Sequence, residues 1–239
     1  MRSRDFGRLI IPGNEAVVDA IVNYGEFSGH EIVLDIGVGD GVLAKEISSH
    51  VKLIIGMDIS EHMLRAGLRS GNWKDNIIPI IGDVRKAHFL EKTFDCIIAS
   101  YLLHHTKGYT ENIVQECYKI LKWGGSLIIV FPVPPHDDLK EEFATIFSFK
   151  DDRIVLLPHE ILELVRNAKF RSIQYDFLRI TIDVIDWLNN SALDPNSYKK
   201  ILNLHLNASK LFKEAYNMRV DKNRAMIDTK AIVIKGLKW

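Results

Sequence analysis

Asp35-Ile36-Gly37-Val38-Gly39-Asp40-Gly41 joins an apolar run to a helical stretch, and this junction decides the fold. Its glycines allow a tight turn and a close approach of the backbone to a ligand, and the N-terminus of the following helix directs amide donors at that ligand. A dinucleotide fingerprint requires G-x-G-x-x-G, whereas this stretch reads G-x-G-x-G, with Val42 at the third glycine position. An acid also precedes the first glycine, and its negative charge would not favour the binding of a pyrophosphate group.

Short apolar runs recur along the chain, at residues 31–36, 53–58, 77–83, 94–100 and 126–131. They are apolar throughout rather than alternating, which is typical of strands that are buried on both faces of a parallel sheet. Because proline lacks the N–H that a sheet ladder needs, we expect the third strand to begin at Pro79.

Helical stretches separate these runs, and the expected helices cover residues 41–49, 61–69, 111–121 and 159–168. Ser60 and Thr110 are expected to cap the second and third helices. Gly124-Gly125 is expected to end the third helix, and Pro158 to open the fourth. The alternation of strands and helices predicts an α/β doubly wound sheet.

The last quarter of the chain follows another pattern. Residues 171–182 alternate in part and predict a sixth strand nearer an edge, and residues 231–234 predict a seventh. The helical pattern between them, over 183–224 with a break at Asp194-Pro195, is too long for a turn and predicts a lid over the working edge of the sheet. We therefore expect one domain, with residues 1–28 as an N-terminal helical segment, 29–182 as the core, 183–224 as the helical lid and 225–239 as the last strand.

Composition excludes several classes of protein. The 239 residues are 47% hydrophobic and 26% charged, which excludes a disordered chain or a fibre. Thirty-one basic and thirty-one acidic residues give no net charge, so a nucleic-acid partner is not expected. Two cysteines cannot form a disulfide framework and suit a reducing compartment. No apolar stretch reaches the length of about 18 residues that a membrane span needs, and no signal peptide is recognised, so we expect a cytoplasmic protein.

Further acids stand at the ends of the next two strands. Asp58 ends the second strand, where a carboxylate can accept two hydrogen bonds from ribose hydroxyls. Asp83 ends the third strand, where it can accept from an exocyclic adenine amine. Together with Asp35, these acids suit a ligand that has a cationic end, a ribose and an adenine. Each also has a structural explanation: Asp35 and Asp83 as turn residues, and Asp58 as a cap of the next helix.

The sequence resembles the class I S-adenosylmethionine-dependent methyltransferases, and most of all the small-molecule group that includes the ubiquinone and menaquinone methyltransferases. The motifs that carry the resemblance stand in the family's order and spacing, at residues 33–41, 56–64, 82–84, 94–105 and 120–125. The resemblance implies a Rossmann-like, seven-stranded, mostly parallel sheet with an antiparallel last strand. It also implies S-adenosylmethionine as the cofactor, S-adenosylhomocysteine as the product and a small organic molecule as the methyl acceptor.

The resemblance also implies roles for the residues that match the family's motifs. The methionyl end of the cofactor would lie against Asp35, Gly37 and Gly39. Asp58 would bind the ribose and Ile59 would pack on the adenine. Further site residues are Asp83 for the adenine amine, Val84 for the ring, and Ser100 with Tyr101 for the floor near the sulfonium.

Two positions depart from the family pattern. Trp123 replaces a usual proline before Gly124-Gly125, and Lys169-Phe170 stands where glycine-phenylalanine is common. Both lie away from the expected cofactor, so they put the shape of local loops in doubt rather than cofactor binding.

Methyl transfer requires a general base only when the acceptor must lose a proton. His104 and His105 are the candidates, because an imidazole with a pKa of about 6.5 can take a proton at neutral pH. Either histidine can instead be structural, hydrogen-bonded in the loop before the next helix. Tyr101 is expected to shape the pocket or contact the methyl group. His136 with Asp137-Asp138 either reaches the acceptor or, as the preferred interpretation, forms a solvated loop.

Two acceptor chemistries are disfavoured. Methyltransferases that act on an amino group of adenine or glutamine carry Asp/Asn-Pro-Pro-Tyr, where this chain has Ala99-Ser100-Tyr101-Leu102. No cysteine adjoins Pro132, so cysteine-dependent methylation of a pyrimidine C5 atom is not suggested either. No Cys/His cluster has metal-ligand spacing, so no metal is expected. Aromatic residues of the lid either enclose an apolar or aromatic acceptor or form core: Trp187, Tyr198, Phe212 and Tyr216.

Three alternative functions stay open. The same scaffold can act on RNA or protein through basic residues such as Lys199, Lys200, Lys210 and Lys213, although acids share their region. The chain can also be a NAD-dependent oxidoreductase or a non-catalytic cofactor-binding protein. The identity of the acceptor and the oligomeric state are not readable from the sequence.

Overall fold

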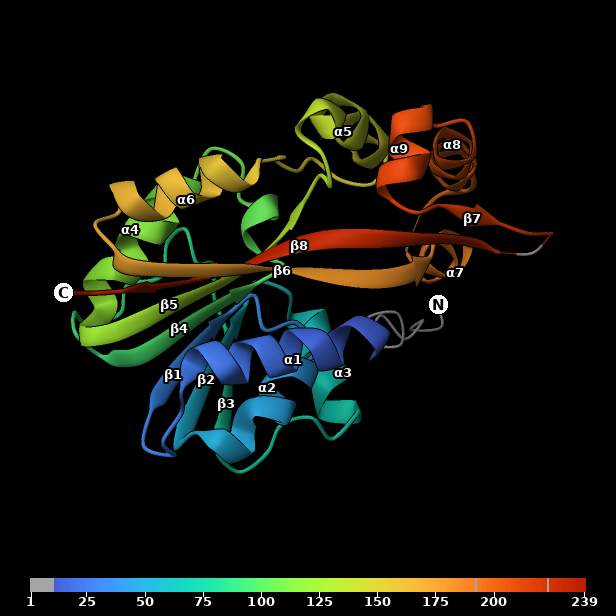
Figure 1. Ribbon diagram of the computed structural model, residues 1–239. Helices are drawn as coiled ribbons and strands as arrows, with labels where there is room; N and C mark the ends of the chain where they lie inside the picture. The colour runs from blue at the N-terminus through green and yellow to red at the C-terminus, as the bar shows by residue number, and fades with distance from the viewer. Residues whose placement is uncertain (1–10, 192, 223) are drawn as a thin grey trace.

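The computed structural model describes residues 11–191, 193–222 and 224–239 (Figure 1). Its strands are β1 Ile32–Ile36, β2 Leu53–Asp58, β3 Ile77–Ile81, β4 Phe94–Ser100, β5 Leu121–Val133, β6 Arg171–Asp183, β7 Arg219–Val220 and β8 Ala225–Leu237. Its α-helices are α1 Ile11–Gly25, α2 Val42–Ile47, α3 Glu61–Arg69, α4 Thr110–Ile120, α5 Lys140–Ser148, α6 Pro158–Asn167, α7 Val184–Asn190, α8 Pro195–Leu206 and α9 Lys210–Ala215. Short 3₁₀ turns cover Ser48–His50, Leu103–His105 and Asp137–Leu139.

The described strands form one sheet in the order β3-β2-β1-β4-β5-β8-β6, and β7 pairs with β8. Strands β1 to β5 are parallel, whereas β8 runs antiparallel to both β5 and β6. The strand order reverses between β1 and β4, so the two loops that follow these strands diverge there and leave a crevice at the carboxyl edge. The expected α/β doubly wound, mostly parallel fold with an antiparallel last strand is confirmed.

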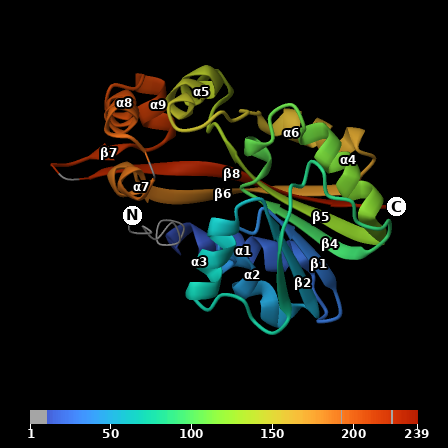
Figure 2. The same ribbon diagram turned by 180° about the vertical axis from the view of Figure 1, so that it is seen from behind.

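Helices cover both faces of the sheet, with α1, α2 and α3 on one face and α4 and α6 on the other (Figures 1 and 2). Neighbouring residues of each central strand point to opposite faces. Val33 packs in the core cluster that includes α1 and α2, while Leu34 packs in the cluster that includes α4 and α6. Burial on both faces is the reason why these strands are apolar throughout.

Strands β6 and β8 continue beyond the rest of the sheet. Pairing between β5 and β8 ends at Val133 opposite Lys230, but β6 and β8 stay paired as far as Asp183 opposite Met226. This two-stranded ribbon therefore extends past the carboxyl ends of the parallel strands, as both views show (Figures 1 and 2).

The far end of the ribbon carries α5, α7, α8 and α9, which we call the helical cap (Figure 1). The cap has its own buried cluster, separate from the two clusters that flank the sheet: Leu139, Phe143, Ile146, Val184, Leu188, Ile201, Phe212, Tyr216, Ala225 and Ile227. Since Ala225 and Ile227 belong to β8, the cap is packed onto the ribbon and held above the carboxyl edge of the sheet.

The third strand differs from its expected form. Strand β3 begins at Ile77, so Pro79 lies inside it rather than at its start. It is an edge strand that pairs only with β2, and Ile78 and Ile81 are exposed. An edge strand tolerates proline, because the missing N–H can face away from the ladder. The expectation that every apolar run is buried on both faces is therefore wrong for β3.

Two helix boundaries also differ. Ser60 caps α3 as expected, with its Oγ accepting from the Met63 N–H at 3.3 Å. Thr110, however, is the first residue of α4 rather than its cap, and its hydroxyl donates back to the Thr106 carbonyl. Helix α4 ends at Ile120, and Gly124-Gly125 lies inside β5, which starts at Leu121.

Two elements have no counterpart among the expected ones, namely helix α5 and the short strand β7. The expected N-terminal helical segment, residues 1–28, contains α1, while residues 1–10 lie outside the described residues. Lys169 takes the left-handed conformation, with φ of +74°, at the position where the family commonly has glycine.

Candidate functional site

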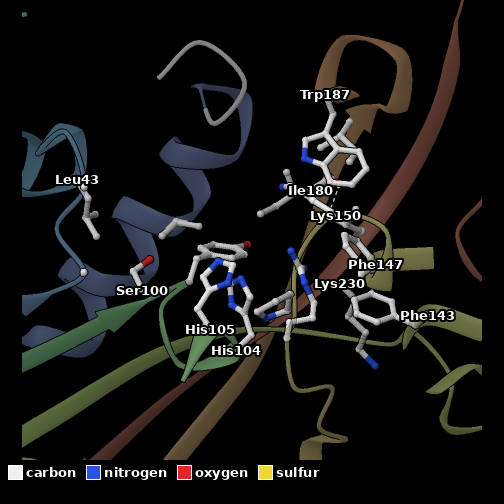
Figure 3. A pocket seen from close by; sticks show the side chains of 18 of the residues that line it. Leu43, Ser100, His104, His105, Phe143, Phe147, Lys150, Ile180, Trp187 and Lys230 are labelled. Carbon is white, nitrogen blue, oxygen red and sulfur yellow. Dashed lines mark hydrogen bonds between the residues drawn. The ribbon is translucent and has the colours of Figure 1, made fainter. Parts of the chain in front are cut away.

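A cavity of about 480 Å³ lies at the carboxyl edge of the sheet. Its walls come from the loop after β1, the turn after β4, the β6–β8 ribbon and the helical cap. Figure 3 shows Leu43 and Ser100 at one side, His104 and His105 in the middle, and Phe147, Lys150 and Trp187 at the other side. We call these sides the loop half and the cap half of the cavity.

The glycine loop is held in place by the end of β2. The N–H groups of Gly37 and Val38 both donate to the Met57 carbonyl, at 2.7 and 3.1 Å. Gly37 has φ of +76°, and a Cβ there would lie 2.8 Å from Leu102 Cδ1. A side chain at this position would be strained and would collide with the turn after β4, so the sequence requires glycine there.

The other end of the loop is held by Trp73. Gly41 has φ of +77°, and a Cβ there would lie only 2.1 Å from the Trp73 ring. The indole N–H donates to the Leu64 carbonyl at 3.0 Å, and Asn72 Nδ2 donates to the Asp40 carbonyl at 2.9 Å. The loop is therefore fixed by these side chains together with backbone hydrogen bonds, among them the one from the Gly41 N–H to the Val38 carbonyl at 3.0 Å.

Asp35 lies at the end of β1, under the glycine loop, and is 1% exposed. Its Oδ2 has no hydrogen-bond partner, although the carboxyl group faces the cavity. Burial, and to a smaller extent the nearby Asp58, raise the pKa of Asp35 to about 8. A buried acid without a donor is costly unless a ligand supplies one.

Asp58 lies beside the loop at the end of β2. Its Oδ2 accepts from the Gly39 N–H at 2.9 Å, and its Oδ1 accepts from the Ser60 N–H at 2.8 Å. Each carboxylate oxygen keeps a further lone pair for a ligand hydroxyl. Neither Asp58 nor the neighbouring Ile59, which is 62% exposed, lines the cavity itself. Both lie along the same sheet edge, outside the cavity wall.

Asp83 and Val84 also lie outside the cavity wall. Both oxygens of Asp83 accept from the Arg85 guanidinium, with distances of 2.7 to 3.1 Å. This ion pair lowers the pKa of Asp83, and the guanidinium lies over the Tyr109 ring. Val84 packs against the core cluster on the α4 side. An adenine amine at Asp83 would therefore have to share the carboxylate with Arg85.

The floor of the cavity is made by the end of β4. Ser100 ends the strand, and Tyr101 follows it with φ of +50°, a conformation that is strained for a bulky residue. The Tyr101 N–H donates to the Val130 carbonyl at 2.9 Å, which fixes this backbone. Burial raises the pKa of the Tyr101 hydroxyl to about 12, so it stays protonated at neutral pH.

His104 and His105 form the middle of the cavity (Figure 3). Their ring centroids are 3.9 Å apart, and His104 packs edge-on against Phe131. His104 is 5% exposed and its Nδ1 has no hydrogen-bond partner. Burial lowers the pKa of both rings, and the positive charges of Arg153 and Lys150 lower it further. Both imidazoles are therefore neutral at pH 7 and can accept a proton.

The cap half combines aromatic rings with cations. The Lys150 ammonium lies 4.6 Å from the centroid of the Trp187 ring, and the Arg153 guanidinium lies 4.2 Å from that of Phe147. Arg153 is also bound to Asp151, with both contacts at 2.5 Å. The cations and the rings thus share one wall of the cavity.

Three buried polar atoms of the described residues have no hydrogen-bond partner: Asp35 Oδ2, His104 Nδ1 and Tyr216 Oη. All three residues line this one cavity, from the loop half, the middle and the cap half respectively. Native proteins satisfy most buried polar groups, so such atoms gathered around one cavity point to a ligand that satisfies them.

The structure brings together most of the expected site residues but not all of them. Those that line the cavity are Asp35, Gly37, Gly39, Ser100, Tyr101, His104 and His105. Among the aromatic residues of the expected lid, Trp187, Phe212 and Tyr216 line the cavity, whereas Tyr198 packs beside the cap cluster. His136 is exposed, and its Nδ1 accepts from the Asp138 N–H at 3.2 Å.

Sequence reasoning missed the residues that α5 and the following segment contribute, above all Phe143, Phe147, Lys150 and Arg153. Their spacing could have predicted this helix, because Phe143, Phe147 and Lys150 stand at i, i+4 and i+7, on one side of a helical stretch.

The described residues contain no group of three or more His, Cys, Asp or Glu side chains that could hold a metal ion. Among the same residues, no helix is long and apolar enough to cross a bilayer.

Comparisons with known proteins agree with the fold and with the motifs. Residues 33–125 match the family model described as a methyltransferase domain. Uncharacterized methyltransferase YcgJ of Bacillus subtilis is 25% identical over 214 residues, which cover 86% of this chain and 84% of that protein. Its crystal structure superposes with a TM-score of 0.84 at 22% identity, over 94% of this chain and 98% of that one.

Two further proteins are similar. Demethylmenaquinone methyltransferase of Porphyromonas gingivalis is 25% identical over 180 residues, 64% of this chain and 73% of that protein. The structure of Haemonchus contortus phosphoethanolamine N-methyltransferase 2, solved with phosphomonomethylethanolamine and S-adenosylhomocysteine, has a TM-score of 0.69 at 19% identity. It covers 95% of this chain and 52% of that one. The resemblance to class I methyltransferases that the motifs indicated is confirmed.

Proposed function

We propose that this chain, which carries a methyltransferase domain over residues 33–125, transfers a methyl group from S-adenosylmethionine to a small organic acceptor. The observation that carries the proposal is the Asp35 carboxyl group, which is buried under the glycine loop with Oδ2 unpartnered. An ammonium group of the cofactor would satisfy that oxygen. The structure of the similar Haemonchus contortus enzyme was solved with S-adenosylhomocysteine, which supports the choice of S-adenosylmethionine as the cofactor here.

The residues along the sheet edge fit the parts of this cofactor. Asp35 would hold the methionyl amine, and the lone pairs of Asp58 that its two backbone donors leave free would accept from the ribose hydroxyls. Ile59, which is exposed beside Asp58, would cover one face of the adenine. Asp83 and Val84 would contact the adenine from the next strand end.

The cofactor, held by Asp35 and Asp58, would supply an activated methyl group for in-line displacement by the acceptor, with the electron pair of the broken carbon–sulfur bond kept by sulfur. The protein mainly has to align the two molecules and exclude water. Ser100 and Tyr101 form the floor at which they would meet. His104, neutral and with Nδ1 unpartnered, would take a proton from an acceptor that must lose one.

Ligand-dependent thermal unfolding tests the proposal. A ligand at about one hundred times its Kd stabilises the folded state by about 2.7 kcal/mol. We expect S-adenosylmethionine and S-adenosylhomocysteine to raise the unfolding temperature and NAD to leave it unchanged. A shift with NAD and none with the sulfur compounds would favour an oxidoreductase instead.

A pair of variants tests whether the cofactor binds at Asp58. Asp58→Ala should weaken the binding of S-adenosylhomocysteine, because both ribose acceptors and the bond to Gly39 are lost. Asp75→Ala, at an exposed aspartate that does not line the cavity, is the matched control and should bind normally. Equal affinity of the two variants would remove Asp58 from the cofactor site.

A further inference from the structure

The two halves of the cavity differ in their acidic and cationic side chains. In the loop half the wall carries acids, Asp35 and Asp40. In the cap half it carries cations, Lys150, Arg153 and Lys230. The proposed cofactor is cationic at its amine and sulfonium, so the acidic half suits it. The basic half must serve another molecule or another group.

Of these three cations, Lys150 and Lys230 form no ion pair among the described residues. The Lys230 ammonium lies over the ring of Phe177, a residue that does not line the cavity, so Lys150 is the cation that the cavity itself must accommodate. Arg153 is bound at both ends of its guanidinium fork by Asp151, which also lowers the pKa of Asp151. Among the described residues, no carboxylate lies within ion-pair distance of the Lys150 ammonium, which rests on the Trp187 ring. Burial together with the charge of Arg153 lowers the pKa of Lys150 to about 8. An ammonium in such a place is stabilised by an anion that comes with a ligand.

The remainder of this wall is apolar and aromatic. Phe143, Phe147, Trp187 and Phe212 line the cap half, and Figure 3 shows the first three around Lys150. Phe143 and Phe147 have ring centroids 4.5 Å apart, and Phe147 and Trp187 have theirs 5.5 Å apart. Such walls favour flat apolar ligands, since rings gain both from area burial and from offset or edge contacts.

A second independent observation points to a ligand here. The Tyr216 hydroxyl faces the cap half, is buried, and has no hydrogen-bond partner. The Tyr216 ring is stacked on Phe212 with centroids 4.2 Å apart, which holds the hydroxyl oxygen in place. A ligand oxygen would satisfy this donor.

We propose that the cap half binds a methyl acceptor with an anionic group on a flat, apolar body, and that Lys150 contacts this group. The inference rests on the proposed function, because it takes the loop half as the place of the cofactor. The acceptor's anion lies at Lys150 and its apolar body between the aromatic rings. The atom to be methylated then faces His104 and His105 in the middle of the cavity.

The segment that carries Lys150 and Arg153 is hydrogen-bonded to the turn that carries His104 and His105. Lys150 and Arg153 belong to the segment between α5 and α6, and the Ile154 N–H of that segment donates to the His104 carbonyl at 2.9 Å. The cations are therefore held at a fixed distance from the histidine turn. This makes Lys150 a specificity-determining residue, which selects the acceptor without taking part in the transfer itself.

A charge series tests the inference with the wild-type protein. Binding of 1-naphthoate, 1-naphthyl phosphate, 1-naphthamide and 1-naphthylmethylamine is measured by calorimetry with S-adenosylhomocysteine present. We expect the two anions to bind at least about tenfold more tightly than the amide and the amine, as a hydrogen bond to a charged group allows. The tighter of the two anions tells whether the site prefers carboxylate or phosphate. Equal affinity of naphthoate and naphthamide would overturn the inference.

A matched pair of variants assigns the effect to one side chain. Lys150→Met should remove the preference for anions and leave the affinity for S-adenosylhomocysteine unchanged. Lys107→Met removes a lysine whose side chain is 60% exposed and pairs with Asp152 outside the cavity, so it should keep the preference. If Lys150→Met weakens S-adenosylhomocysteine instead, Lys150 binds the cofactor and the inference fails. If the wild type binds no S-adenosylhomocysteine at all, the proposed function fails first.

Discussion

The backbone N–H of Ile154 donates to the carbonyl of His104 at 2.9 Å, although the two residues belong to different parts of the molecule. His104 lies in the turn after β4, and Ile154 lies in the segment that leaves the helical cap. The bond joins the histidine pair to the cations of the cap half. A shift of the segment that leaves the cap would therefore also move the turn that carries His104 and His105.

The first prediction concerns the histidines. Burial and the nearby cations lower the pKa of His104 and His105 below 6.5, so both rings stay neutral as the pH falls through 6.5. If His104 is a base, the acid limb of kcat/KM lies below pH 6.5, and His104→Ala lowers kcat by about a hundredfold while the Kd for S-adenosylhomocysteine is unchanged. Steady-state rates between pH 5 and 9 check both points. Unchanged turnover in His104→Ala would show that the ring is structural.

The second prediction concerns the pH dependence of cofactor binding. Because the pKa of Asp35 is raised to about 8 in the free protein, the carboxyl group is protonated at pH 6 and must lose its proton to hold an ammonium group. The affinity for S-adenosylhomocysteine should therefore rise from pH 6 to pH 8 and then level off. Calorimetry in two buffers of different ionisation enthalpy also detects the proton released on binding.

Asp35→Asn is the variant that isolates this effect. At pH 8 it should bind S-adenosylhomocysteine about 10- to 100-fold more weakly, since a charge-assisted hydrogen bond is lost. Its affinity should also change less with pH than that of the wild type. Asp19→Asn, at an exposed position on α1, serves as the control. The same pH slope in Asp35→Asn and wild type would assign the proton to another group.

The third prediction concerns stability. The folded-state pKa of Asp35 lies above the value of 3.8 expected for an unfolded chain, so the unfolded state loses this proton first as the pH rises. Asp35 therefore lowers the free energy of unfolding progressively between about pH 4 and pH 8, by at most about 1.4 kcal/mol per pH unit. Asp35→Asn removes this contribution. Urea unfolding at pH 6, 7 and 8, without ligand, should show the difference between variant and wild type growing in favour of the variant; a constant difference contradicts it.

The fourth prediction concerns the backbone of Tyr101, which has φ of +50°. Tyr101→Ala and Tyr101→Gly remove the same ring, so they differ only in the cost of the left-handed conformation. The glycine variant should be about 1 kcal/mol more stable than the alanine variant, the reverse of their order in a helix or strand. Urea midpoints at equal m-values measure this. An alanine variant of equal or greater stability would mean that the turn relaxes once the ring is gone.

The sequence predicted the parts of the fold that depend on local pattern. Residues 53–58 and 94–100 form β2 and β4 at the expected bounds, because these strands are buried on both faces and nothing in their apolar runs is ambiguous. Pro79 misled the prediction, since a single residue does not reveal that its strand lies at the edge. Gly124-Gly125 misled it too, because a pair that commonly ends a helix here lies inside β5.

The loop half of the cavity was predictable from the sequence, and the cap half was much less so. Asp35, Gly37 and Gly39 are adjacent in sequence, so one short motif places them together. Lys150 and Trp187, whose ammonium and ring are 4.6 Å apart, are brought together only by the packing of α5 against the elements that follow β6. No local pattern encodes such a meeting, which depends on side chains from segments far apart in the chain.

The ribbon of β6 and β8 beyond Val133 separates the packing of the helical cap from that of the sheet. Its outer part shares no ladder with β5, and the cap that it carries has a buried cluster of its own. Substitutions in the cap can therefore accumulate without weakening the parallel strands or disturbing the loop after β1. On the proposed function, the acceptor preference could then change through the cap alone, while the sheet edge proposed to hold the cofactor stays the same.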